Sequence, residues 1–125
     1  MNIIKRALLV LVVACLLSGT ASAQTYILAP SPKFTGLDSS GVTLASARLC
    51  SYSAGTTTAL ATYSDSSGTA NANPIILDSA GRATIYLTSA SYRFILRNTA
   101  ASSSTCTNPG GTVVFDQDNI IAPTA

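Results

Sequence analysis

Residues 82–97 read RATIYLTSASYRFILR and contain two runs in which apolar and polar residues alternate. The apolar positions of the two runs are Ala83, Ile85, Leu87, Tyr92, Phe94 and Leu96. A period of two is typical of strands that bury one face. Only residues 89–91 separate the runs, and a link this short predicts an antiparallel hairpin of strands 82–88 and 92–97.

Strand signals also dominate the rest of the chain after residue 23. This part has no Glu, one Lys, and many β-branched and small residues, a composition that disfavours helices. Further short apolar or β-branched runs lie at residues 47–52, 60–64, 74–77 and 112–115. Clusters of Gly, Asn, Asp and Ser separate these runs. Short strands divided by turn residues predict an all-β fold, either a β-sandwich or a small barrel.

The first 23 residues have the three parts of a cleavable signal peptide. A positive start with Lys5 and Arg6 is followed by an apolar run at residues 7–17 and by small residues at 21–23. The apolar run is too short to span a bilayer, which takes about 20 residues. We therefore expect export and cleavage after residue 23. An alternative is lipidation at Cys15, which follows a Val-Val-Ala sequence that loosely resembles a lipobox.

Removal of residues 1–23 would leave about 100 residues, which fits one domain. We expect an extended N-terminal arm at residues 24–40 that includes one early strand, one β-sandwich domain at residues 41–121 and a tail at residues 122–125. The five basic and five acidic residues after residue 23 balance in charge. A neutral surface gives no reason to expect nucleic acid or an anionic membrane as a partner. Contact with a membrane is expected only through the signal peptide, before cleavage.

Cysteine use agrees with export. The chain has three cysteines, and Cys15 lies within the signal peptide. An even remaining count in an oxidising compartment favours a disulfide between Cys50 and Cys106. That bond would close a loop of about 56 residues and stabilise the fold by about 4 kcal/mol in the chain-entropy model. The alternative is a pair of buried free thiols.

The residue inventory argues against catalysis. The chain has no His and no Glu, so the usual general base, the usual metal ligand and the His-activated nucleophiles are missing. We therefore expect neither enzyme activity nor a cofactor. Asp116, Asp118 and Asn119 carry oxygen ligands of the kind that calcium prefers, but they are too few for a calcium loop. Their alternative role is to cap a strand end or a turn.

A connected series of short motifs runs through residues 41–120. The motifs are Leu49, Tyr52, residues 54–58 (AGTTT), residues 61–63 (ATY), Asp65, Gly68, Asn71, Asn73-Pro74, residues 76–78, 81–83 and 85–87, Tyr92, Phe94, Leu96 and residues 118–120. In order and spacing they resemble a domain that is common in tail-fibre, tail-spike and other appendage proteins of tailed bacteriophages. The resemblance implies an immunoglobulin-like or prealbumin-like antiparallel β-sandwich of about seven strands. It also implies a structural connector or adhesive module without catalysis.

The sequence departs from that phage family in three ways. Phage structural proteins are not normally exported through a signal peptide. Cys50 occupies a position where the family usually has an aromatic residue, and the loop at residues 99–111 is expanded and carries Cys106. The last two departures are explained together by a disulfide that was added after an intracellular fold moved to an oxidising compartment.

We therefore expect a non-catalytic exported module in the periplasm, on the cell surface or outside the cell. It would assemble with itself as a surface or filament subunit, or act as an adhesin-like protein. The N-terminal arm could add a strand to the sheet edge of another copy or of a surface partner protein. The assembly residues expected in this arm are Gln24, Thr25, Tyr26, Ile27 and Leu28.

A secreted carbohydrate-binding or receptor-binding domain is the alternative function. We expect Tyr52, Tyr63 and Tyr86 to be exposed, where they could stack on the sugars of a glycan. The competing role for these tyrosines is cross-strand packing on the face of a sheet.

Overall fold

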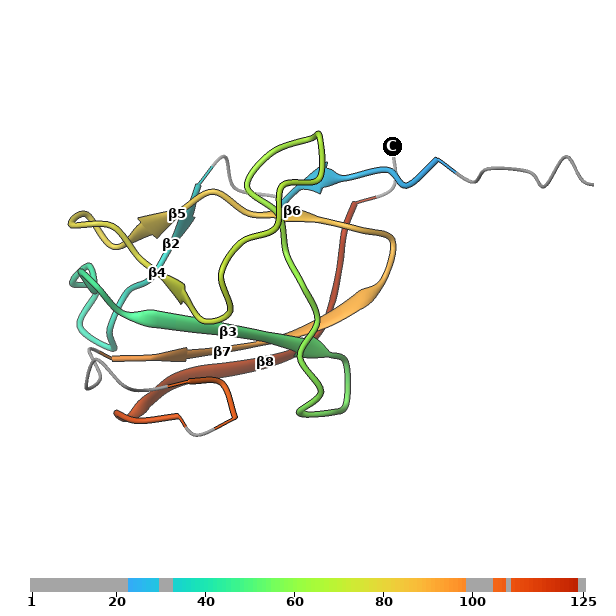
Figure 1. The fold of residues 1–125 in the computed structure, drawn as a ribbon. Coiled ribbons are helices and arrows are strands. Elements are labelled where there is room, and N and C mark those ends of the chain that lie inside the picture. Colours follow the sequence, from blue (N-terminus) through green and yellow to red (C-terminus); the bar gives the residue numbers. More distant parts are fainter. Residues whose placement is uncertain (1–22, 30–32, 99–104, 108, 124–125) are drawn as a thin grey trace, which may run out of the picture.

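The structure is a computed structural model, and it describes residues 23–29, 33–98, 105–107 and 109–123. In these residues the fold contains eight strands and no helix, and every strand pairing is antiparallel. The strands are β1 (Ile27–Leu28), β2 (Phe34–Thr35), β3 (Arg48–Ser53), β4 (Ile75–Ile76), β5 (Arg82–Ala83), β6 (Tyr86–Leu87), β7 (Ser91–Arg97) and β8 (Val113–Ile121). The predicted all-β, antiparallel fold is therefore confirmed (Figure 1). The signal peptide lies almost wholly outside the described residues.

A four-stranded sheet in the order β4-β3-β7-β8 is the largest element of the fold. Its centre is the pairing of β3 with β7, which involves every residue of β3. Leu49 and Leu96 face each other across this pairing, and both are fully buried. The nine-residue strand β8 forms one edge of the sheet, and the two-residue strand β4 forms the other.

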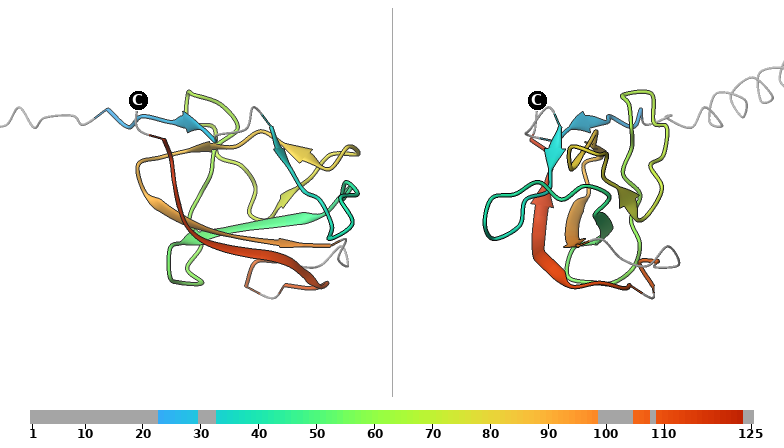
Figure 2. Two further views of the ribbon diagram at one scale, coloured as in Figure 1. Left: turned by 180° about the vertical axis from the view of Figure 1, so that it is seen from behind. Right: turned by 90° about the vertical axis from the view of Figure 1, so that its left-hand side faces the viewer.

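Two short strand pairs, β1–β6 and β2–β5, complete the fold. Figures 1 and 2 show both pairs on one side of the four-stranded sheet. The buried members of the main core are Ala47, Leu49, Ile75, Leu77, Ile85, Leu87, Tyr92, Phe94, Leu96 and Ala122. Both the four-stranded sheet and the short strand pairs contribute residues to this core. The short pairs depend on this packing, because an isolated two-stranded pair is at best marginally stable in water. The more specific expectation, an immunoglobulin-like or prealbumin-like sandwich, stays a prediction.

The predicted hairpin of residues 82–88 and 92–97 is wrong. β6 pairs with β1, whereas β7 pairs with β3 and β8. The alternation itself is real, because Ile85 and Leu87 from the first run enter the same core as the apolar residues of the second run. The two runs cover the core from opposite sides, and residues 88–91 carry the chain from one side to the other (Figure 1).

Three other boundaries differ from the predictions. Residues 60–64 form only isolated bridges and no strand. β8 continues past the predicted end at residue 115 to Ile121. The segment at residues 24–40 contains two short strands, because β1 pairs with β6 and β2 pairs with β5. The ends of these strands are decided by pairing with distant parts of the chain. A local sequence pattern carries no information on that pairing, so it misplaces the ends.

The side chain of Asn73 extends the pairing between β3 and β4. Leu49 faces Ile75 in this pairing, so Ser51 would face residue 73 two positions further along. The Asn73 amide donates to the Ser51 carbonyl at 2.8 Å and accepts from the Ser51 N–H at 3.1 Å. It thus makes both bonds of a strand backbone, beside Pro74, whose nitrogen has no hydrogen to donate.

A disulfide between Cys50 and Cys106 ties β3 to the segment at residues 105–107. Cys50 is buried with Tyr52 and Ile95 in a second cluster, separate from the main core. The Tyr52 hydroxyl donates to the Cys106 carbonyl at 2.9 Å and so fastens the same segment a second time. The pairing that the sequence predicts is therefore present, and it fits an oxidising compartment.

Replacement of Cys50 and Cys106 by Ser should lower the free energy of unfolding by about 4 kcal/mol, because the bond closes a loop with a sequence separation of 56. Urea unfolding of the double variant and of the oxidised parent measures this difference. An unchanged urea midpoint, or two titratable thiols in the native parent, would contradict the prediction.

Candidate functional site

The N-terminal arm, residues 24–28, has an exposed end and a packed end. Gln24 and Thr25 are exposed, whereas Tyr26 and Ile27 are half-buried. Figure 1 shows the chain that leads into β1 running away from the rest of the fold. Contact with the fold is therefore concentrated in the second half of the arm.

Backbone pairing with β6 holds the packed end of the arm. Ile27 lies opposite Leu87 and Leu28 lies opposite Tyr86. The N–H of Ala29 then donates to the Ile85 carbonyl at 2.9 Å. This is a short pairing, and a strand of two residues contributes little on its own.

The other side of β6 is already occupied. Tyr63 donates its N–H to the Tyr86 carbonyl at 3.0 Å and accepts from the Tyr86 N–H at 2.7 Å. β6 therefore lies between Tyr63 and the arm. Because both sides of β6 are paired, the arm completes a small three-part sheet that would otherwise end in an open edge.

The ring of Tyr26 anchors the arm beside this edge. It meets the ring of Tyr63 edge to face, with centroids 4.5 Å apart and an angle of 66° between the planes. It also lies against Gly68, where an added Cβ would come within 2.7 Å of the Tyr26 ring. We call Tyr63, Gly68 and β6 the socket, because together they receive the side chain and the backbone of the arm.

A tight turn holds Gly68 in position. The Asp65 carboxylate accepts the N–H of Ser67 at 2.8 Å and the N–H of Thr69 at 3.2 Å. Hydrogen bonding by Thr69, from its side chain and then its backbone, holds the pKa of Asp65 below its ordinary value. Gly68 itself has φ +89°, a conformation that other residues adopt only with strain. Because Gly68 has no side chain, the turn leaves room for the Tyr26 ring to pack against its backbone.

The arm also closes the main core. Ile27 and the following Ala29 pack against the buried core residues. The exposed end of the arm lies beside Ser89, and Gln24, Thr25, Ile27 and Ser89 line a shallow hollow of about 260 Å³. Of the predicted assembly residues, Tyr26, Ile27 and Leu28 therefore contact the socket, whereas Gln24 and Thr25 lie beside Ser89.

The tyrosines proposed for sugar stacking do not form one exposed surface. The expectation that Tyr52 is exposed is wrong, because only 3% of this residue is accessible. Burial raises the pKa of Tyr52, and the Tyr52 hydroxyl donates a hydrogen bond to the Cys106 carbonyl. Tyr63 and Tyr86 are half-buried, and the ring of Tyr26 covers one side of Tyr63.

Each of the two carboxylates considered as calcium ligands has a protein partner. Asp116 accepts two hydrogen bonds from Arg93, at 2.8 Å from Nε and 2.6 Å from Nη2. Asp118 accepts the Gly55 N–H, at 3.0 and 3.1 Å from its two oxygens. Asn119 has φ +56°, and the register of β8 shifts near it. In the described residues no group of three or more His, Cys, Asp or Glu could hold a metal ion.

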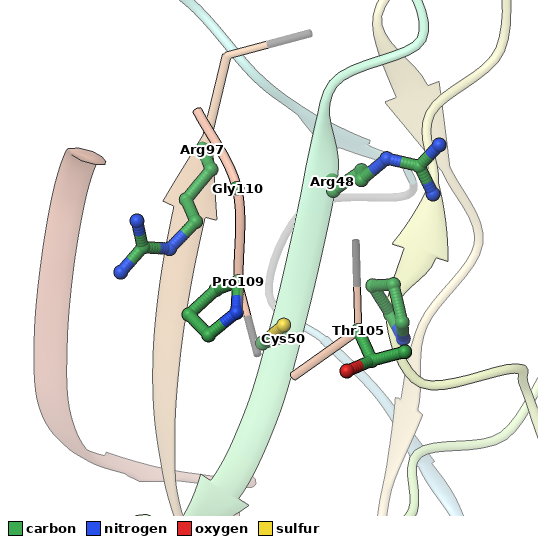
Figure 3. Close-up of a pocket in the computed structure, with 7 residues that line it drawn as sticks. Arg48, Cys50, Arg97, Thr105, Pro109 and Gly110 are labelled. Carbon is green, nitrogen blue, oxygen red and sulfur yellow. The ribbon is translucent and has the colours of Figure 1, made fainter. Parts of the chain in front are cut away.

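A hollow near the disulfide is too narrow to bind a ligand. Its lining residues are Arg48, Cys50, Pro74, Arg97, Thr105, Pro109 and Gly110 (Figure 3). Figure 3 shows the guanidinium groups of Arg48 and Arg97 pointing away from each other. Since the hollow leaves no space for a water molecule, these cations do not form an anion site.

Neither a scan against protein-family models nor a search of curated proteins found a match to this chain. The resemblance to phage appendage proteins stays a prediction that rests on the sequence motifs. In the part of the chain that the structure describes, no helix is long and apolar enough to cross a membrane.

The fit of Tyr26 against Gly68 predicts a specific effect of Gly68→Ala. Gly41→Ala is the matched control, since Gly41 has φ +81° and no atom lies within 4 Å of its added Cβ. Both variants carry the backbone strain, but only Gly68→Ala displaces the Tyr26 ring. We expect Gly68→Ala to lower the free energy of unfolding by about 1 kcal/mol more than Gly41→Ala, which is the worth of an aromatic pair. The difference should vanish when Tyr26 is also replaced by Ala.

The pair of Arg93 and Asp116 predicts a pH dependence of stability. Hydrogen bonding by Arg93 lowers the pKa of Asp116 in the folded state. Its stabilising contribution is therefore full above the unfolded-state pKa of about 4 and is lost as the pH falls through the folded-state pKa. Asp116→Asn should lose less stability than the parent between about pH 5 and about pH 2 in thermal unfolding. Arg93→Gln should behave in the same way, and equal losses in all three proteins would contradict the assignment.

Proposed function

We propose that this protein is an exported, non-catalytic structural module that assembles with itself as a surface or filament subunit, or acts as an adhesin-like protein. The observation that carries the proposal is the arm: an uncharged segment with a short strand and a tyrosine that fits a matching socket. Strand addition is a recurrent way in which proteins bind an extended segment. It requires neither a catalytic residue nor a cofactor.

The two edges of the four-stranded sheet are poorer acceptors for a strand. β8 is the long edge of the main sheet, but it carries Asp116 and Asp118 and has an irregular register near Asn119. Charges and bulges of this kind discourage edge-to-edge pairing. β4 has only two residues, so it offers little backbone to pair. The β6 edge, which already receives an arm, is the most suitable acceptor.

Export is part of the proposal. The signal-like first 23 residues support it, and so does the disulfide, since such bonds persist in oxidising compartments. The periplasm, the cell surface and the extracellular space all meet this condition. The resemblance to phage appendage domains supports a structural or adhesive role, and the absence of His and Glu from the sequence supports a role without catalysis.

The alternative function, carbohydrate or receptor binding, has weaker support. Stacking on a sugar needs an exposed aromatic face. Tyr52 is buried, and Tyr63 packs against Tyr26 within the fold. We therefore favour assembly over glycan recognition.

Deletion of residues 24–28 tests the proposed function. Because Ile27 packs on the core, the deletion also removes core contacts, so Tyr26→Ala serves as a milder second variant. Both variants should shift the protein from multimers to monomers in size-exclusion chromatography, and no filaments should form in electron microscopy. Circular dichroism checks that each variant retains its strands. Unchanged multimers in a folded Tyr26→Ala variant and in the deletion variant would reject the arm as the assembly element.

A further inference from the structure

We propose that the arm is exchanged between copies, so that the arm of one copy occupies the socket of the next in the register seen within one chain. This inference rests on the proposed assembly function and names its partner as a second copy of this chain. It assigns Tyr63, Gly68 and β6 as the acceptor site and Tyr26 and Ile27 as the inserted residues.

The contacts between arm and socket are independent of which copy supplies the arm. The ring of Tyr26 against Tyr63, its fit on Gly68 and the pairing of Ile27 with Leu87 would be the same in either case. Exchange of an identical element between copies is therefore a low-cost route to assembly.

The packing of the arm gives a reason for every socket to be filled. Without an arm, the outer side of β6 would be unpaired, and the core beside Ile27 and Ala29 would be open. An exposed strand edge next to apolar surface is a site for association. A copy whose own arm has left would therefore take an arm from a neighbour, rather than remain open.

The short contact of the arm with its own chain makes exchange feasible. The paired region is β1, two residues long, and one further backbone bond from Ala29. Gln24 and Thr25 are exposed, so the arm enters the socket from an accessible side. If each copy gives one arm and receives one, two copies that exchange arms reciprocally form a closed dimer, whereas head-to-tail exchange produces a ring or an open filament.

A cross-linking experiment distinguishes exchange from an arm that folds back on its own chain. The register that places Ile27 opposite Leu87 places Thr25 opposite Ser89, and both of these residues are exposed and line the same hollow. Thr25→Cys and Ser89→Cys are made as separate variants of the exported chain, from which residues 1–23 and with them Cys15 have been removed, and they carry tags of different mass. The two are mixed in urea, refolded together with the native disulfide intact, and treated with a short bismaleimide, which reacts with the two new thiols.

Exchange predicts a covalent dimer that contains one copy of each variant. It also predicts cross-links between chains of the double variant, which carries both cysteines in one chain: a dimer if two copies exchange reciprocally, and a ladder of multimers if exchange is head-to-tail. Thr25→Cys mixed with Ser39→Cys is the control, because Ser39 is exposed in the turn after β2. Figures 1 and 2 show the segment after β2, drawn in teal, at the other end of the fold from β1. This control pair should give no dimer above the level of Thr25→Cys alone.

Three other outcomes would overturn the inference. Multimers on size exclusion, combined with cross-links only inside single chains of the double variant, would show that assembly occurs without exchange and leave the proposed function standing. A monomeric protein with the same internal cross-link would overturn both. Absence of any cross-link in the double variant would show that the arm does not occupy the socket in this register, which also refutes exchange.

Discussion

The pairing of β3 with β7 is the interaction on which the rest of the structure depends. One face of this pairing carries Leu49 and Leu96 into the main core. The other face carries Cys50 and Ile95 into the second cluster, where the disulfide begins. A shift of one residue in the register would exchange these two sets, because side chains alternate along a strand. Both the core and the disulfide therefore depend on one backbone alignment.

The arm depends on the same alignment indirectly. β6 presents its outer edge to the arm because Leu87 is fixed in the core that the β3–β7 pairing builds. Tyr63 pairs with the inner side of β6 and holds the ring on which Tyr26 rests. The socket is thus held in place by packing in the main core, whereas the disulfide stabilises the opposite face of the four-stranded sheet. Loss of the disulfide would then weaken the domain without altering the socket itself.

The sequence predicts the class of fold and several strands, because alternation in residues 92–97 reports a local property of a half-buried strand. It fails where pairing is non-local. Residues 82–88 and 92–97 are close in sequence, yet they face each other across the core and not within one sheet. β8 is underestimated because Asp116, Asp118 and Asn119 look like a strand end, although cross-strand partners such as Arg93 accommodate them.

The candidate site is predictable in part for the same reason. The arm is visible as an aromatic and apolar Tyr26-Ile27-Leu28 segment, and it includes residues that contact the socket. The socket is not visible, because Gly68 has the sequence context of an ordinary turn glycine and its contact with Tyr26 spans a long stretch of chain. Tyr52 is expected from the sequence to be exposed, but it is buried beside the segment that carries Cys106. The sequence does not show this contact, because the two residues lie far apart in the chain.

The position of β1 in the chain has a consequence for the order of folding. Ile27 and its partner Leu87 are separated by about sixty residues, and pairings with such long loops form late because closing the loop costs entropy. The arm precedes the other described strands in the chain, yet its own socket is complete only once β6 has packed on the core. Under the proposed exchange, an arm that is still unpaired could enter the socket of a neighbouring copy. The local concentration of folding chains would then decide whether a copy closes on itself or joins its neighbour.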